Sequence, residues 1–113
     1  LNTLEGEVLD AASGRVKIEG NEVTLGRTVP AGKITLAARP EMISLGDHPG
    51  RETRMKGTIN DVHFLGSVIR IRAQVGESVL AFDTFNASDS PPPKVGEMVT
   101  LSLAARDLLV VGA

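Results

Sequence analysis

Residues 69–75 alternate between two kinds of side chain. Every second position is apolar and the positions between are polar: Ile69, Ile71, Ala73 and Val75 against Arg70, Arg72 and Gln74. Successive side chains of an extended chain point to opposite sides, so this segment predicts a strand with one dry face and one solvated face. No window of the sequence has the apolar spacing of an amphipathic helix. We therefore expect an all-β fold.

Similar segments recur along the chain, separated by glycines and prolines. Gly20-Asn21 predicts a hairpin turn, because both residues tolerate positive φ. Pro40 ends a strand, since it has no N–H to donate, and favours a short turn of helix after it. Polar loops are expected at 46–54 and 86–94. The expected strands are 4–9, 15–19, 22–25, 33–39, 55–64, 67–75, 78–85, 98–103 and a buried final run at 108–111.

The motifs of the first half return in the same order in the second half. Leu-Ala-Ala-Arg occurs at 36–39 and at 103–106, and the other matches are Leu4–Val8 with Met55–Ile59, Gly14 with Gly66, and Gly32 with Gly96. This order predicts one domain, 1–113, made of two repeats at about 1–46 and 54–113 that are joined by the polar loop 46–54. A unit of about five short strands buries little alone, so the copies should pack together. Similar glycine placement in all small β-barrels is the alternative explanation.

Composition excludes several classes of function. The net charge is −2 and the chain has no Trp or Tyr. Single-stranded nucleic acids are bound by basic grooves with exposed aromatic rings, so nucleic acid is not an expected partner. There is no cysteine for a disulfide framework, and no apolar run approaches the ~20 residues of a membrane span. Because the first residue is Leu, we expect a piece of a longer protein.

The sequence also lacks the patterns of common catalytic sites. The segment Gly26–Ile34 departs from a phosphate-binding P-loop, because five residues separate its glycines and Ile follows the lysine. His48 and His63 stand alone and do not predict a zinc site. Asp61 and Asp83 are expected in surface or turn roles. We therefore expect no catalytic residue, no metal and no cofactor in this chain.

One weak candidate for ligand binding is the turn Gly66-Ser67. Its backbone N–H groups and the serine hydroxyl could hydrogen-bond a small oxyanion. A simple hairpin turn is the other interpretation of the same two residues.

Two longer stretches resemble a known family. These are "LAARPEMISLG" and "GTINDVHFLGSVIRIRAQVG", followed by a strand that begins at Gly96 and a final "DLLVV". Together they resemble the transport-associated OB-like (TOBE) domain at the C-terminus of ATP-binding subunits of ABC importers. The motif positions are Arg39, Pro40, Glu41, Gly57, Phe64, Leu65 and Gly66. The resemblance covers nearly the whole chain and is closest to importers of polyamines, ferric iron and similar small solutes.

The resemblance implies a fold and a role. The fold would be a pair of MOP-like barrels that exchange strands. The role would be regulatory and structural: a non-catalytic domain that pairs with the same domain of a second ATPase subunit. Its further partners would be its own nucleotide-binding domain and, indirectly, the permease. ATP and magnesium would be bound by that missing domain, and the complex would lie on the cytoplasmic face of the membrane.

The resemblance also suggests what the motif residues do. Arg39 and Glu41 would form an ion pair that fastens the crossover between the repeats, with Pro40 setting the bend, or they would contact another protein. The alternative for the whole chain is a free-standing protein that binds a small oxyanion of the molybdate type.

Overall fold

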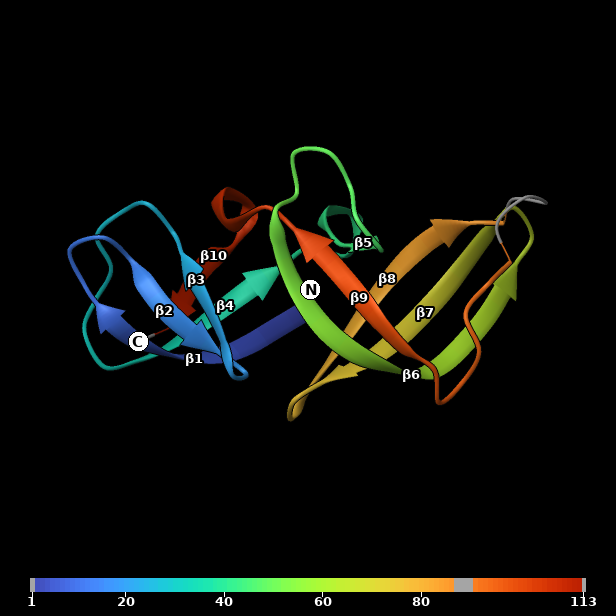
Figure 1. Cartoon of the computed structure of the whole chain (residues 1–113), viewed down its shortest axis with the longest axis horizontal. Coiled ribbons are helices and arrows are strands. Elements are labelled where there is room, and N and C mark those ends of the chain that lie inside the picture. Colours follow the sequence, from blue (N-terminus) through green and yellow to red (C-terminus); the bar gives the residue numbers. More distant parts are fainter. Residues whose placement is uncertain (1, 87–90, 113) are drawn as a thin grey trace.

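The computed structural model describes residues 2–86 and 91–112, and these form two curled five-stranded antiparallel sheets side by side. Figure 1 shows them as two small barrels along the long axis of the molecule. The chain contains no α-helix within the described ranges, so the all-β prediction is confirmed. Residues 87–90 of the expected loop 86–94 lie outside those ranges.

The first repeat supplies β1 to β5, and the second supplies β6 to β10. Each has a single turn of 3-10 helix before its last strand. The bounds in the first repeat are β1 Asn2–Asp10, β2 Arg15–Ile18, β3 Asn21–Thr24, β4 Lys33–Ala38, η1 Pro40–Met42 and β5 Ser44–Leu45. Those in the second are β6 Thr53–Leu65, β7 Val68–Val75, β8 Ser78–Phe85, β9 Met98–Leu103, η2 Ala105–Asp107 and β10 Leu109–Gly112.

The last strand of each repeat crosses to the other sheet. The strand orders are β10-β4-β1-β2-β3 and β5-β9-β6-β7-β8. In Figure 1, the red β10 lies beside the teal β4 at the edge of the first barrel's sheet, and β5 lies beside β9 of the second. The predicted duplication with strand exchange is therefore confirmed. A strand held in the other repeat's sheet ties the two barrels into one body.

Two irregularities recur at equivalent positions. The β1–β2 ladder shifts register between Val8 and Asp10, and the β6–β7 ladder shifts between Ile59 and Asp61. Gly6 and Gly57 lie two residues before these bulges. A Cβ at Gly6 would come within 3.1 Å of a backbone carbonyl oxygen, and one at Gly57 within 3.3 Å. Glycine at both positions thus lets the neighbouring strand approach closely, and a larger residue would push that strand away by a few tenths of an ångström.

The Leu-Ala-Ala-Arg match is out of register by two residues. Leu36 pairs with Leu4, whereas Leu101, not Leu103, pairs with the equivalent Met55. As a result Arg39 precedes η1, but Arg106 lies inside η2, at the position equivalent to Glu41. The sequence alignment was wrong here because a slip of two residues leaves every strand side chain on the same face.

The core runs through both barrels. The predicted dry face of β7 is confirmed, since its four apolar residues are at most 1% exposed. The prediction of a buried final run is wrong beyond Leu108: Leu108 is buried, but residues 109–111, on the edge strand β10, are exposed. The two-residue strand β5 was not predicted. Its length carries no periodicity, and it exists only because β9 offers an edge.

The Glu19 side chain of the first repeat also forms hydrogen bonds with the second repeat. The Glu19 carboxylate, in the turn between β2 and β3, accepts hydrogen bonds from the Ser78 hydroxyl at 2.8 Å and from the Glu77 N–H at 2.9 Å. The two equivalent turns, β2–β3 and β7–β8, therefore meet between the barrels. Glu19 takes positive φ, +48°, to make this contact.

Candidate functional site

The candidate site is a hollow beside η1, where the second barrel remains open between β8 and β5. Pro40 stands at the first helical position, and Arg39 before it is extended, with φ −73° and ψ 141°. This geometry turns the chain sharply and brings Glu41 to face the end of β8. The hollow is lined by Glu41, Ile43, Ser44, Leu45, His48, Arg51, Asp83, Thr84 and Phe85.

Arg51 fixes one wall of the hollow. Its guanidinium donates to the Ser44 hydroxyl at 2.5 Å and to the Glu41 carbonyl oxygen at 3.2 Å. Its backbone N–H donates to the His48 carbonyl oxygen at 3.0 Å. The polar loop after β5 is therefore folded back on η1 and β5, and charge-assisted hydrogen bonds of this kind hold a loop in one arrangement.

Asp83 supplies the acidic wall. The Arg70 guanidinium donates to both of its carboxylate oxygens, at 3.0 and 3.2 Å. These hydrogen bonds hold the pKa of Asp83 below its ordinary value and raise that of Arg70. Asp83 is thus ionised and paired at neutral pH. It is suited to fixing the position of β7 against β8, and not to carrying a proton.

The two motif segments approach each other at this hollow. An apolar extension of it is lined by Glu41, Val68, Asp83, Thr84 and Phe85. Val68 follows the tip of the β6–β7 hairpin, where Phe64, Leu65 and Gly66 lie. The Arg-Pro-Glu segment and the hairpin therefore come close through Val68 and Phe85. Gly57 lies apart from them, inside the sheet.

The expected ion pair between Arg39 and Glu41 is wrong. Over residues 2–86 and 91–112 the ion pairs are Arg15–Glu22, Arg54–Asp47 and Arg70–Asp83. Arg39 is exposed before the helix, whereas Arg51 reaches the backbone of Glu41 from the loop. A crossover fastening therefore exists, but its cation is Arg51, which sequence reasoning did not single out.

The second repeat has an equivalent hollow beside η2. It is lined by Thr24, Leu25, Gly50, Glu52, Thr53, Ala104, Ala105 and Arg106. Arg106 stands where the first repeat has Glu41, and its guanidinium donates to the Gly50 carbonyl oxygen at 3.5 Å. Arg106 and the two threonines carry groups that can donate hydrogen bonds to a small oxyanion, whereas the Glu52 carboxylate in the same lining would repel one. The arginine of the second Leu-Ala-Ala-Arg motif, Arg106, was the sequence signal from which this hollow could have been predicted.

The weak oxyanion candidate, Gly66-Ser67, is an exposed hairpin turn. Gly66 takes φ +79°, and Val68 pairs with Leu65 across the turn. Asn86 donates its side-chain amide to the Gly66 carbonyl oxygen at 3.3 Å and its N–H to the Ser67 carbonyl oxygen at 2.9 Å. These bonds tie the tip to the end of β8. Oxyanion binding there stays a prediction.

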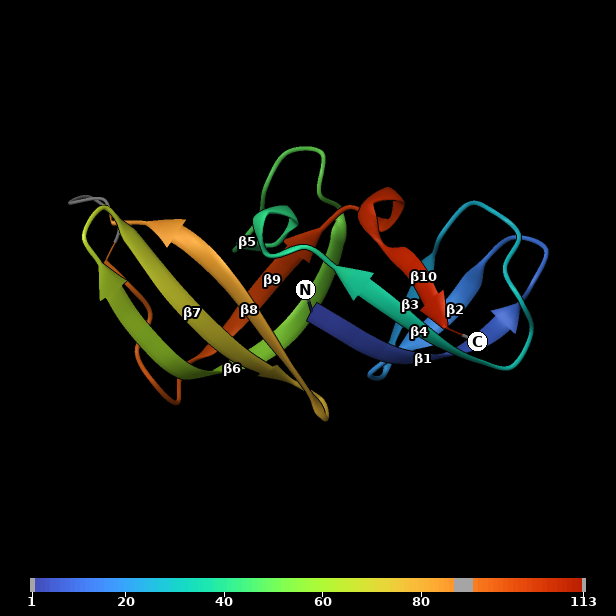
Figure 2. The same cartoon turned by 180° about the vertical axis from the view of Figure 1, so that it is seen from behind.

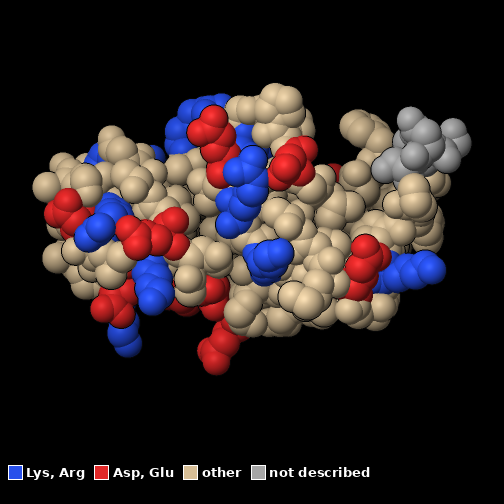
Figure 3. Space-filling view, viewed as in Figure 1, with Lys and Arg blue, Asp and Glu red and all other residues tan. Residues whose placement is uncertain are grey.

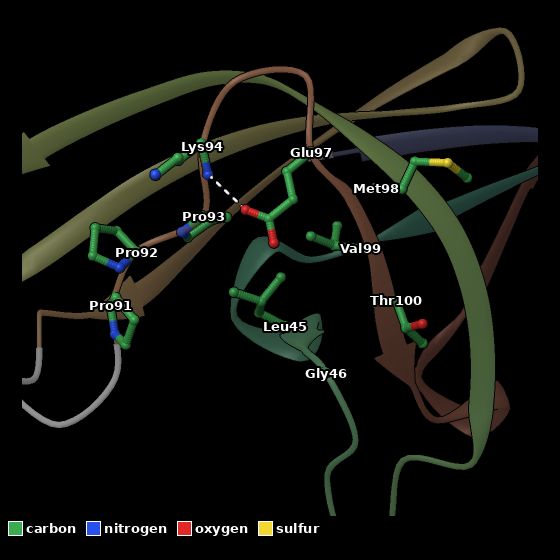
Figure 4. Close-up of a pocket in the computed structure, with 10 residues that line it drawn as sticks. All are labelled: Leu45, Gly46, Pro91, Pro92, Pro93, Lys94, Glu97, Met98, Val99 and Thr100. Atoms are coloured by element: carbon green, nitrogen blue, oxygen red, sulfur yellow. Dashed lines mark hydrogen bonds between the residues drawn. The ribbon is translucent and has the colours of Figure 1, made fainter.

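A larger, open hollow of about 500 Å³ lies between residues 91–94 and the edge of β9. Figure 4 shows three prolines on one side, Leu45 and Val99 facing them, and Met98 at the start of β9, pointing away from the prolines. The Lys94 N–H donates to the Glu97 carboxylate at 3.0 Å and closes the turn before β9. Its walls are mostly apolar, so it lacks the converging polar groups of a specific small-molecule site.

Metal binding has no support within the described ranges. They contain no cluster of three or more His, Asp or Glu side chains that could hold an ion. His48 is exposed with its Nδ1 2.8 Å from the Pro49 carbonyl oxygen. His63 is exposed opposite Arg70. Residues 2–86 and 91–112 also hold no helix long and apolar enough to cross a membrane.

The face seen in Figure 3 has no large patch of only positive or only negative side chains. Acidic and basic side chains alternate over the first barrel and the central loop, while much of the second barrel is uncharged. Such a surface does not attract a polyanion such as nucleic acid.

The fold and these hollows define the class of tandem small OB-like barrels. A solved structure of the cytoplasmic molybdate-binding protein ModG, with molybdate bound, is similar at a TM-score of 0.79; the alignment covers 96% of this chain and 94% of that one at 11% sequence identity. A search of curated proteins gave no match. The TOBE domain family matches residues 36–111. The chain belongs to the TOBE domain family.

Proposed function

We propose that this chain is the non-catalytic C-terminal regulatory and dimerisation domain of the ATP-binding subunit of an ABC importer. The observation that carries the proposal is the η1 hollow. There the Arg-Pro-Glu segment and the β6–β7 hairpin, the two parts of the family motif, come together in a TOBE domain.

The proposal assigns partners and a location. The chain pairs with the same domain of a second subunit and follows its own nucleotide-binding domain, which binds ATP and magnesium. It meets the permease indirectly, at the cytoplasmic face of the membrane. A small solute such as a polyamine or iron is the proposed cargo, on the strength of the motif resemblance.

Truncation of the full subunit tests this role. Removing the segment should leave ATP hydrolysis by the nucleotide-binding domain and alter its control by the transporter, because the domain regulates without catalysing. The isolated chain should hydrolyse no ATP. A truncated transporter with unchanged transport and unchanged ATPase control would contradict the regulatory role.

A second function, small-oxyanion binding of the molybdate type, is favoured by two observations. One is the fold shared with molybdate-bound ModG, and the other is the set of donors around Arg106 in the η2 hollow. The comparisons support this second function more directly than the first. Calorimetry with molybdate, tungstate and sulfate tests it, and Arg106→Ala should abolish any heat seen. Absence of heat at millimolar ligand would remove this function.

A further inference from the structure

The outer face of β6, β7 and β8 presents an apolar row at the end of the second barrel. Leu65, Val68 and Phe85 lie directly opposite one another across the three strands. They share a face with Arg70 and therefore point away from the core. The strands can be followed in Figure 2, where β7 and β8 cross in front of β6.

This row is unusually exposed for apolar side chains. Phe85 is 79% exposed and Leu65 is 53% exposed, while Val68 is half-buried. Phe64, one residue before Leu65, is 59% exposed as well, but it pairs with the buried Ile69 and so lies on the opposite face of β6. Two of the chain's three aromatic side chains thus meet solvent at one end of one barrel. Clustered exposed aromatic and aliphatic groups mark interaction surfaces, because aromatic anchors dominate interface energetics.

Charged residues of both signs border the apolar row on the same face. The next row is His63, Arg70 and Asp83, and the one after it begins with Asp61 and Arg72. Arg70 and Asp83 pair within the chain. Asp61 and Arg72 form no ion pair within residues 2–86 and 91–112. A cation and an anion side by side are complementary to the same pair turned through 180°.

We propose that this face is a homodimer contact, with a second copy of this chain as its occupant. The inference rests on the proposed function, whose dimerisation it locates. In a two-fold arrangement, Leu65 and Phe85 pack against their own counterparts. Arg72 of each copy then faces Asp61 of the other, which gives two symmetric contacts. A two-fold interface requires such a self-complementary patch.

The patch is small, and its size fixes the expected strength. A stable interface takes about 20–30 residues a side, several times more than these rows provide. The isolated chain should therefore dimerise weakly, with a dissociation constant on the order of 10⁻⁴ M. In the full subunit, the rest of the assembly would hold the two copies near each other.

Reversing the charges of Arg72 and Asp61 tests this contact in the 113-residue chain. Sedimentation equilibrium from about 10 µM to about 1 mM should show a monomer–dimer equilibrium. Arg72→Glu alone and Asp61→Lys alone should each weaken dimerisation by about tenfold, because each places like charges together at two symmetric points. An equimolar mixture of the two variants should dimerise as the unchanged chain does, since all facing charges are then opposite.

Shortening the Phe85 side chain gives an independent test. Phe85→Ser should weaken dimerisation, whereas the matched Val95→Ser, at a residue that is 67% exposed elsewhere on the second barrel, should not. Both sites are exposed, so folding is retained, which circular dichroism checks. If dimerisation is unchanged in Phe85→Ser and in both charge variants, the dimer uses another surface. This inference is then wrong, while the proposed dimerisation role remains. A monomer at every concentration also overturns the inference, and the truncation experiment then decides the regulatory role by itself.

Discussion

The Asn2 side-chain amide forms two hydrogen bonds with the backbone of Ala81, both at 2.8 Å. Its Nδ2 donates to the Ala81 carbonyl oxygen, and its Oδ1 accepts from the Ala81 N–H. The first described residue of β1 thus occupies the free edge of β8, in the other barrel. A side chain that pairs like a strand both links the barrels and blocks further strand addition at this point.

Asn2→Ala should lower the free energy of unfolding by about 1–3 kcal/mol, because it leaves the edge N–H and C=O of Ala81 without partners. Urea denaturation measures the change. Thr3→Ala is the matched control at an exposed neighbouring position and should change the free energy by less than about 0.5 kcal/mol. Equal effects for the two variants would show that the Asn2 contact contributes nothing.

Gly76→Ala should destabilise the chain far more than Gly20→Ala. Both glycines have positive φ, +58° and +83°, so both pay the same kind of backbone strain. A Cβ at Gly76 would lie 2.1 Å from Glu19 Oε2, while a Cβ at Gly20 has open space. The carboxylate ends a flexible side chain and can move aside, but it then loses its hydrogen bonds from the Glu77 N–H and the Ser78 hydroxyl. The expected loss is about 1 kcal/mol for Gly20→Ala and about 2–3 kcal/mol for Gly76→Ala. Thermal unfolding of both variants provides the comparison.

A double-mutant cycle with Glu19→Ala isolates the clash, because alanine removes the carboxylate and keeps a side chain at this positive φ. If the clash is the cause, Gly76→Ala should cost less in the Glu19→Ala background than in the unchanged chain. An equal cost in both backgrounds would assign the loss to backbone strain and refute the steric account.

The ion pair of Arg70 and Asp83 should make stability depend on pH in the acid range. The pKa of Asp83 is lower in the folded chain than its ordinary 3.8 because Arg70 donates to it. Its stabilising contribution is therefore present above pH 3.8 and is lost as the pH falls through the lower, folded-state pKa. Because the pair is exposed, the effect should be small.

Carboxyl NMR titration of Asp83 checks this directly. In Arg70→Gln the pKa of Asp83 should rise toward its ordinary value, and the stability difference between the two proteins should shrink as the pH falls. An unchanged titration of Asp83 in Arg70→Gln would mean that Arg70 is not the cause of the lowered pKa.

The sequence predicted the sheets well because alternation and glycine punctuation are local signals. It placed the hairpins of both repeats and their duplication. It misaligned Leu36–Arg39 with Leu103–Arg106, since a two-residue slip preserves the face of every strand residue. It also missed β5, whose two residues become a strand only when β9 lies beside them.

The candidate site was predicted only in part. Glu41 was singled out by its motif, and η1 by Pro40. Arg51 and Asp83 meet at the same hollow from a polar loop and from β8, and no local pattern relates positions so far apart in the sequence. The same reason hid the η2 hollow, where Thr24 and Thr53 come from different repeats.

The most direct test of the proposed function is the reading frame upstream of Leu1. The proposal predicts about 230–250 further in-frame residues that carry a Walker motif, the size of one nucleotide-binding domain. A frame that opens near Leu1 would contradict it and favour the free-standing oxyanion-binding protein.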